Sequence, residues 1–185
     1  MTLRSNISGT NILVVGGAGF VGSNLIYALL QYDIKSILIV DNLLSSEKES
    51  LPSDRRLSFL EGSIADDEVL KSLNQDFDYI FHLATYHGNQ SSIHNPLADH
   101  QNNVITTLKL CEKYKSHRGL KKLIYSSAGC TVAEKKYGDV LASTEDQPVS
   151  LYHDSPYQIS KLVGEFYGNY YFSRYKLPFV KARFQ

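Results

Sequence analysis

The stretch that most constrains the fold spans residues 11–41, in which Gly16, Gly19 and Gly22 are spaced GxxGxxG. The apolar run at residues 12–15 precedes the glycines, and apolar residues at helical spacing follow them. A second apolar run then ends in an acid. This order predicts a buried strand, a tight turn, an amphipathic helix and a second strand.

Each glycine has a separate expected role. Because it lacks a Cβ, Gly16 can adopt a tight turn, Gly19 lets the backbone approach a pyrophosphate, and Gly22 lets the helix pack close to the strand. The helix is expected to begin at Phe20 and Val21, and the pyrophosphate would bind to the free N–H groups at its N-terminus. Gly-rich turns without a ligand are common, but here all the surrounding elements occur in the expected order.

Asp41 ends the second strand about 20 residues beyond the glycines. There its carboxylate can accept hydrogen bonds from the adenosine ribose hydroxyls, and it would repel a 2′-phosphate. The pattern therefore favours NAD over NADP as the cofactor.

The whole chain has 185 residues, with 19 basic and 19 acidic side chains and no net charge. This length fits one domain over residues 1–185, and the charge balance gives no reason to expect nucleic acid or a membrane as a partner. Cys111 and Cys130 have no metal-binding spacing, and we find no apolar signal segment and no run of 18 apolar residues. We expect a cytoplasmic protein with no metal site and no membrane span.

The remaining pattern alternates strands and helices. Further strands are expected at residues 57–60, 79–84 and 123–126 and from 178 onward, with helices at 65–73, 96–116 and 155–175. This alternation predicts an α/β fold, a doubly wound parallel sheet of the Rossmann type with strand order 3-2-1-4-5-6. The polar segment that ends at Asp154 is too long for an ordinary connection, so we expect a functional loop there.

Tyr157 and Lys161 form a YxxxK pair on the last predicted helix, and this spacing places both side chains on one face. Such a pair occurs often by chance, and alone it would more often mark a solvated helix face. Here it follows a dinucleotide-type turn and a serine, Ser127, at the end of the fifth predicted strand. This combination resembles the extended short-chain dehydrogenase/reductase family, which includes NAD-dependent epimerases and dehydratases of nucleotide sugars.

The resemblance implies a nucleotide-sugar substrate and a catalytic set of Ser127, Tyr157 and Lys161. A sugar hydroxyl must lose its proton as its carbon gives hydride to NAD⁺. Tyrosine has an ordinary pKa near 10, so a tyrosine base needs its anion stabilised, here by Lys161 and the nicotinamide. Lys161 would also bind the nicotinamide ribose, and Ser127 would share the substrate proton.

The resemblance also implies a set of residues around the cofactor. Besides Tyr157 and Lys161, this set is Gly16, Gly19, Phe20, Val21, Gly22, Asp41, Asn42, Ser63, Ile64, Leu83, Ala84, Thr85, His87 and Asn103. Ser63 replaces the family's adenine-binding Asp, so adenine recognition rests more on Ile64 and backbone groups. Asn103 matches the Asn of the family's NVxGT motif, although an exposed polar turn would also explain it. His87 is as well explained as an ordinary loop histidine, and His82 as a core histidine.

The residues after Ser127 narrow the reaction. Related dehydratases carry Asp-Glu there, whereas this chain has Ala128 and Gly129, which cannot transfer a proton. Epimerisation at a sugar carbon is therefore favoured over the alternative enzymes, a nucleotide-sugar dehydratase or reductase. A dinucleotide-binding sensor or scaffold without turnover is the alternative from another class.

Two expectations concern assembly. In the resembled family, the two long helices, here 96–116 and 155–175, pair with their copies in a homodimer, and the second carries much aromatic surface. The chain ends just after the sixth predicted strand, where that family continues into a substrate domain. We therefore expect the C-terminal substrate domain to be absent from this chain and the isolated chain to turn over nucleotide sugars negligibly.

Overall fold

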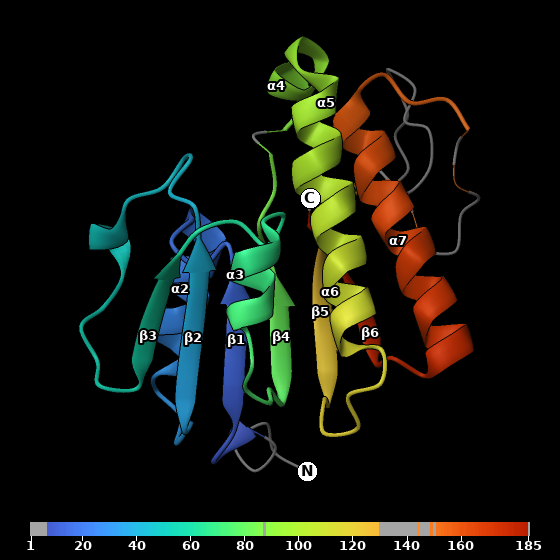
Figure 1. Ribbon diagram of the computed structural model, residues 1–185. Coiled ribbons are helices and arrows are strands. Elements are labelled where there is room, and N and C mark those ends of the chain that lie inside the picture. The colour runs from blue at the N-terminus through green and yellow to red at the C-terminus, as the bar shows by residue number, and fades with distance from the viewer. Residues whose placement is uncertain (1–6, 87, 130–143, 145–148, 150, 185) are drawn as a thin grey trace.

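The computed structural model describes residues 7–86, 88–129, 144, 149 and 151–184, and its centre is a six-stranded sheet (Figure 1). The strands are β1 (Asn11–Val15), β2 (Ser36–Asp41), β3 (Leu57–Glu61), β4 (Tyr79–His82), β5 (Lys122–Ala128) and β6 (Phe179–Phe184). All neighbouring strands pair in parallel, in the order β3-β2-β1-β4-β5-β6. The predicted fold class and strand order are confirmed.

Helices lie on both faces of this sheet (Figure 1). The helices of the described residues are α2 (Phe20–Leu29), the short η1 (Lys48–Ser50), α3 (Asp67–Ser72), α4 (Asn89–His94), α5 (Pro96–Asp99), η2 (His100–Ile105), α6 (Thr106–Tyr114) and α7 (Pro156–Tyr175). The helix predicted at residues 96–116 is present as α5, η2 and α6 in succession, and η2 is a π-helix. Helix α4 was not predicted.

Local sequence signals explain where the longest helix starts and stops. The side chain of Ser155 caps α7 by accepting from the backbone N–H of Gln158, and Pro156 occupies the first turn, where its missing N–H does no harm. At the other end Lys176 takes a left-handed conformation with φ 60° and closes the helix. The predicted range of this helix is confirmed within one residue.

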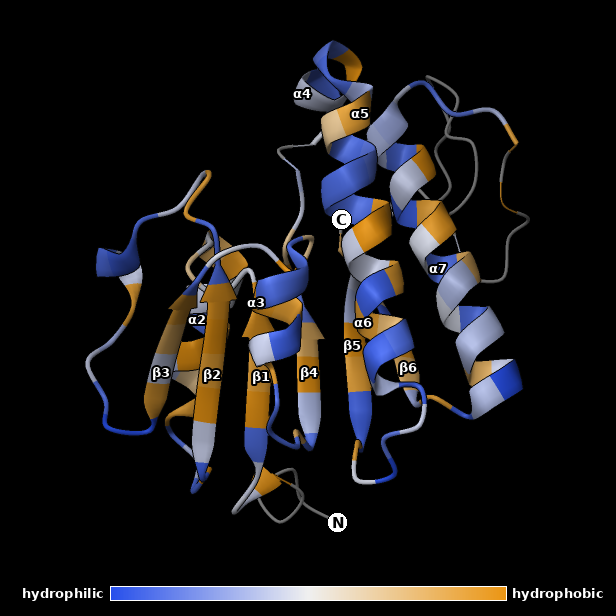
Figure 2. Cartoon of the chain, viewed as in Figure 1, coloured by the Kyte–Doolittle hydropathy of each residue, from blue (hydrophilic) through white to orange (hydrophobic). Residues whose placement is uncertain are grey.

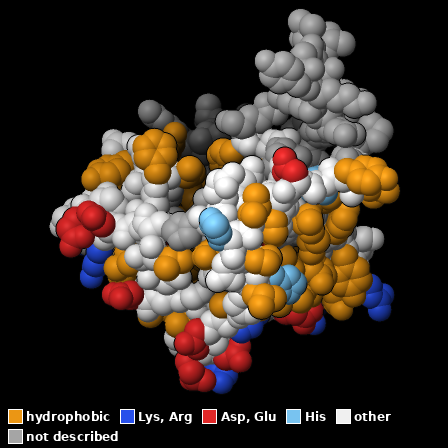
Figure 3. Space-filling model, turned by 90° about the horizontal axis from the view of Figure 1, so that it is seen from above, with side chains coloured by type: hydrophobic (Ala, Val, Ile, Leu, Met, Phe, Trp, Pro, Cys, Tyr) orange, Lys and Arg blue, Asp and Glu red, His pale blue; other side chains and the backbone are white. Residues whose placement is uncertain are grey.

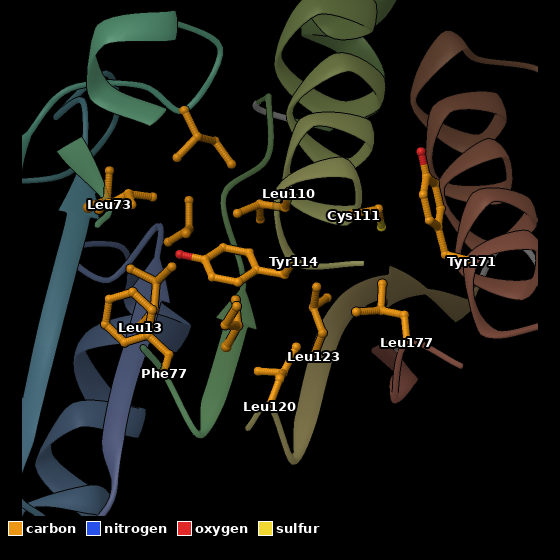
Figure 4. Packing of buried hydrophobic residues seen from close by; sticks show 14 residues of the cluster. Leu13, Leu73, Phe77, Leu110, Cys111, Tyr114, Leu120, Leu123, Tyr171 and Leu177 are labelled. Atoms are coloured by element: carbon orange, nitrogen blue, oxygen red, sulfur yellow. The ribbon is translucent and has the colours of Figure 1, made fainter. Parts of the chain in front are cut away.

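The core consists of two apolar layers, one on each face of the sheet. On one face, β1 contributes Leu13 to a cluster that includes Leu110 and Tyr114 of α6 and Tyr171 of α7 (Figure 4). On the other face, alternate residues of β1 pack against α2. Burial on both faces explains why the central strands are continuous apolar runs, visible as orange strands in Figure 2.

Because the strands are parallel, their carboxyl ends meet at one edge of the sheet, which is the upper edge in Figure 1. The strand order reverses between β1 and β4, and ligands of open α/β sheets bind at such a point. Seen from above, this side of the molecule carries groups of hydrophobic side chains (Figure 3). The topology therefore places the expected ligand site at the junction between β1 and β4.

Candidate cofactor and catalytic site

Close contacts around the turn between β1 and α2 require glycine at two positions of the motif, Gly16 in the turn and Gly22 in α2. Gly16 has φ 81°, and a Cβ on it would lie 2.4 Å from the backbone nitrogen of Ala84. A Cβ on Gly22 would lie 2.3 Å from the carbonyl oxygen of Gly16. These contacts confirm the tight turn and the close packing, and they show that α2 packs most closely on the turn itself.

Gly19 differs, because the fold does not require a glycine there. It precedes α2 with an ordinary φ of −69°, and its nearest neighbour for an added Cβ would be the Gly16 carbonyl oxygen at 3.6 Å. That distance is a normal van der Waals contact. A glycine at this position thus leaves room beside the helix N-terminus, as a close-lying anion would need.

A cavity of about 260 Å³ opens at the junction. Its wall includes these predicted cofactor residues: Gly16, Gly19, Phe20, Val21, Gly22, Asp41, Asn42, Ser63, Ile64, Leu83, Ala84 and Thr85. Sequence reasoning missed Val15, Val40, Leu44, Ser45, Ser46, Gly62, Asn102 and Thr106, which also line it. Position at a strand end is the signal that could have identified Val15 and Val40.

Asp41 is held rigidly at one end of this cavity. Its Oδ2 accepts from the backbone N–H of Ala18 at 2.9 Å, and its Oδ1 accepts from the Leu43 N–H and the Ser46 hydroxyl, each at 3.0 Å. A carboxylate offers about four acceptor positions, so three bonds leave one for a ligand hydroxyl. The bond to Ala18 also fixes the carboxylate relative to the glycine turn.

Ser63 and Ile64 lie between β3 and α3, on the cavity wall. The Ser63 hydroxyl accepts from the backbone N–H of Ala65 at 3.2 Å, so it stabilises the turn before α3. Ile64 is buried in the core on the same side as α3. Ile64 and Ser63 both line the cavity, and their contact with an adenine ring stays a prediction.

Tyr157 and Lys161 lie on one face of α7, as predicted. The Lys161 Nζ is 5.6 Å from the centroid of the Tyr157 ring, and it donates to the carbonyl oxygen of Ser126 at 2.8 Å. The lysine is 1% exposed, which is unusual for an ammonium group and makes its neighbours important. The hydrogen bond from the Lys161 ammonium group to the Ser126 carbonyl oxygen holds this side chain between α7 and β5.

Asn103 lies inside η2 and is buried, so an exposed polar turn is the wrong interpretation of it. Its Oδ1 accepts from the backbone N–H of Tyr86 at 2.8 Å and from the Thr85 hydroxyl at 3.2 Å. Its Nδ2 donates to Asp99 and Ser160. The other predicted residue of this region, His87, lies outside the described residues.

His82 is a core histidine. It is 1% exposed at the end of β4, and its Nε2 lies 3.0 Å from the Thr107 hydroxyl oxygen. Burial, with a smaller contribution from the charge of Lys161, lowers the pKa of His82 to about 3. The imidazole is therefore neutral at physiological pH and does not supply a proton.

The model of the NAD dependent epimerase/dehydratase family matches residues 12–185. The chain belongs to the NAD-dependent epimerase/dehydratase family. Within this family, the UDP-glucose 4-epimerase of Mycolicibacterium smegmatis is 35% identical over 172 residues, which cover 89% of this chain and 52% of that protein.

Two solved structures are also similar to this chain. The Bordetella bronchiseptica enzyme WbmF in complex with NAD⁺ is 52% identical, with a TM-score of 0.85 over 97% of this chain and 50% of that one. The UDP-N-acetylglucosamine 4-epimerase of Methanobrevibacter ruminantium, in complex with UDP-N-acetylmuramic acid, is 31% identical, with a TM-score of 0.83 over 96% and 55% of the two chains. The chain thus spans about half the length of these family members.

Ser127 has an environment that its family motif does not predict. It lies within β5, which extends to Ala128 rather than ending at residue 126. Its hydroxyl is buried and donates to Oε1 of Glu165 at 2.5 Å. Arg183 of β6 donates to both oxygens of the same carboxylate, at 2.8 and 2.7 Å. The serine therefore belongs to a buried ionic cluster that joins β5, β6 and α7.

Two further findings describe this family member. Among the described residues, we find no group of three or more His, Cys, Asp or Glu side chains arranged to hold a metal ion. A search of the same part of the chain finds no helix that is long and apolar enough to span a membrane.

Proposed function

We propose that this chain is the cofactor-binding and catalytic part of an NAD-dependent nucleotide-sugar epimerase. The observation that carries the proposal is the cavity between Gly16 and Asp41, at the sheet edge where Lys161 of α7, beside Tyr157, donates to the Ser126 carbonyl oxygen near the carboxyl end of β5. The residues fit the dinucleotide, because the space beside Gly19 suits a pyrophosphate and the free position on Asp41 suits a ribose hydroxyl. The solved complex of WbmF with NAD⁺ and UDP supports this proposal.

In this mechanism, NAD⁺ supplies a hydride acceptor when bound. Tyr157 accepts the proton of the sugar hydroxyl as its phenolate and becomes a neutral phenol, and the nearby ammonium of Lys161 stabilises the phenolate before this transfer. Lys161 orients the nicotinamide ribose. Ser127 remains the proposed third member, although its present bond to Glu165 would have to be exchanged for one to the substrate.

The end of β5 favours epimerisation over dehydration. Ala128 and Gly129 follow Ser127 directly, and neither side chain can remove or add a proton. An elimination of water needs such groups beside the sugar. Oxidation and re-reduction of one sugar carbon needs only the tyrosine and the hydride acceptor.

The test is the reduction of bound NAD⁺ when UDP-, GDP-, CDP- or dTDP-sugars are added, followed by the absorbance of the reduced nicotinamide. Steady-state epimerisation of the same sugars is measured in parallel. Reduction with any sugar supports the proposal, and the sugar that reacts identifies the substrate. Negligible steady-state epimerisation is the expected result for this chain alone, whereas NAD⁺ binding with no reduction by any sugar, even in a single turnover, would favour the sensor or scaffold function.

We expect NAD to bind at least about tenfold more tightly than NADP, because a 2′-phosphate would meet the Asp41 carboxylate. Substituting Asp41→Ala should narrow this difference. Isothermal titration calorimetry with both dinucleotides measures it, and Asp33→Ala, at an exposed loop hydrogen bond, is a suitable control. Tighter binding of NADP by the parent chain would contradict this expectation.

Gly19→Ala should reduce NAD affinity about tenfold or more while leaving the fold intact, because its Cβ would occupy the space reserved for the pyrophosphate. The free energy of unfolding should change by less than about 1 kcal/mol. Gly16→Ala is the contrasting variant: it should destabilise the fold by at least about 1–3 kcal/mol, because of its positive φ and because its Cβ would lie 2.4 Å from the Ala84 backbone nitrogen. Unchanged NAD affinity in Gly19→Ala would refute the role of this glycine.

Self-association of the chain is a further proposal. On α7 the side chains of Ile159, Phe166 and Tyr170 recur on one face and are 49%, 56% and 52% exposed, whereas Tyr171 is buried in the core. Such an apolar stripe suits a symmetric interface with a second copy. Light scattering at micromolar concentration should give the mass of a dimer, and Phe166→Glu should give a monomer. A monomeric parent chain would count against it.

A further inference from the structure

The buried carboxylate of Asp99 is not explained by the roles assigned above. It lies at the last residue of α5, directly before the π-helix η2, and is 1% exposed. No motif in the sequence singled it out. Carboxylates are almost never buried so completely unless they are paired, so the burial of the Asp99 carboxylate needs a structural explanation.

The structure shows what Asp99 contacts. Its Oδ1 accepts from Nδ2 of Asn103 at 2.8 Å, and that same Nδ2 lies 3.1 Å from the Ser160 hydroxyl oxygen. On its other side, the Asn103 amide oxygen accepts from Tyr86 and Thr85. An amide group has two donor and two acceptor positions, so Asn103 has none left for a ligand.

This arrangement joins three walls of the site. Thr85 lines the cavity from the loop after β4, and Asn102 and Thr106 line it from η2 and the start of α6. Ser160 lies on α7, directly beside Lys161. π-Helical turns inside α-helices frequently occur at functional sites, and this one places Asn103 where it reaches both the loop and α7.

From this geometry we propose that Asp99 is a positioning residue, which fixes the amide of Asn103 and thereby holds the loop after β4 and the Lys161 turn of α7 around the cofactor cavity. The inference rests on the proposed binding of NAD. It assigns Asn103 an indirect role in place of the direct cofactor contact expected from the family motif.

The direction of the hydrogen bonds supports this assignment. An ionised carboxylate can only accept, and the Tyr86 N–H can only donate, so the two together leave the Asn103 amide one orientation. Asp99 also interacts with the charge of Lys161. A neutral group at position 99 would lack this fixed polarity and this charge.

The carboxylate of Asp99 is also expected to destabilise the fold at neutral pH. Burial raises the pKa of Asp99, and the opposing effects of Ser160, Lys161, Asn103 and His100 do not compensate fully. A carboxyl whose folded-state pKa is raised stabilises the fold below its unfolded value, and this contribution is lost as the pH rises through the folded value. At neutral pH a neutral residue of the same shape should therefore fold at least as well.

The experiment measures NAD affinity by calorimetry and melting temperature at pH 7.5 for the parent chain and three variants. Asp99→Asn should keep or raise the melting temperature and weaken NAD binding about fivefold. Asn103→Asp places two carboxylates together, so it should weaken NAD binding more than tenfold and lower the melting temperature. The double variant Asp99→Asn/Asn103→Asp restores a donor facing an acceptor with the polarity reversed, and it should recover affinity to within about threefold of the parent.

Asp78→Asn is the control, because Asp78 lies at the opposite end of the sheet and should leave NAD affinity unchanged. A parent chain that does not bind NAD would overturn the proposed function, and this inference with it. If the parent binds NAD, the inference alone is overturned by parent-like affinity in Asp99→Asn and Asn103→Asp, or by a double variant no better than Asn103→Asp. A loss of affinity in Asp99→Asn that only accompanies a fall in melting temperature would likewise overturn it.

Discussion

Replacing Glu165 with alanine should lower the free energy of unfolding by about 3–5 kcal/mol, the usual effect of removing one partner from a buried ion pair. The Glu165 side chain is 3% exposed and accepts from the guanidinium of Arg183, whose side chain is 13% exposed. Lys181 lies 3.8 Å away, and the Ser127 hydroxyl donates to the same carboxylate. Without the carboxylate, the guanidinium would remain in a poorly solvated place without its acceptor.

Urea denaturation of the parent and variant chains measures this effect. Glu68→Ala is the matched control, because its ion pair with Lys71 is exposed and should contribute about 0.5 kcal/mol or less. The double variant Glu165→Met/Arg183→Met should recover much of the loss, since it removes both charges. A loss in Glu165→Ala no larger than in the control would contradict the importance of the cluster.

The same cluster gives an expected pH dependence. Burial would raise the pKa of Glu165, but hydrogen bonds from Arg183 and Ser127 outweigh it and hold this pKa below its ordinary value of 4.5. A lowered folded-state pKa means that the stabilisation is present above the ordinary value and is lost as the pH falls through the folded value. The difference in stability between parent and Glu165→Ala should therefore shrink below pH 4.5.

Tyr157→Phe should slow hydride transfer about a hundredfold or more, because it removes the only atom of this side chain that can accept the sugar proton. The ring should keep its place beside Lys161, so the fold and NAD affinity should be preserved. The measurement is the single-turnover rate at which a reactive sugar reduces bound NAD⁺.

A second tyrosine on the same helix gives the control for this experiment. Tyr170 is 52% exposed, near the far end of α7, and Tyr170→Phe should leave the rate unchanged. Equal rates in Tyr157→Phe and the parent would show that another group takes the proton.

Much of the fold could be predicted from the sequence because its signals are local. The apolar runs that became β1 and β2, the glycine turn and the Ser155-Pro156 helix start all act within a few neighbouring residues. The same holds for the i, i+4 spacing of Tyr157 and Lys161. Asp41 was found because a strand end has a fixed relation to the glycine turn in this type of sheet.

The rest depends on contacts between residues far apart in the sequence. Ser127 was predicted to share the substrate proton, but its partner Glu165 comes from α7 and is held in turn by Arg183 of β6, and no local pattern relates these residues. Asp99 and Asn103 are four residues apart, yet their role appears only when α7 and the loop after β4 pack beside them. The π-helix was not predicted either, because the apolar spacing that indicates a helix does not distinguish a π-helical turn from an α-helical one.

The seam between β1 and β4 has a consequence for how the chain folds. Ile12 pairs with Tyr79, so the two halves of the sheet are joined by contacts between residues far apart in the sequence. Closing so long a loop makes such a contact slow to form. The cavity lies across that seam, with Gly16 on one side and Ala84 on the other. A dinucleotide bound there would contact both halves, and by mass action it would favour the fully assembled sheet over states in which only one half is folded.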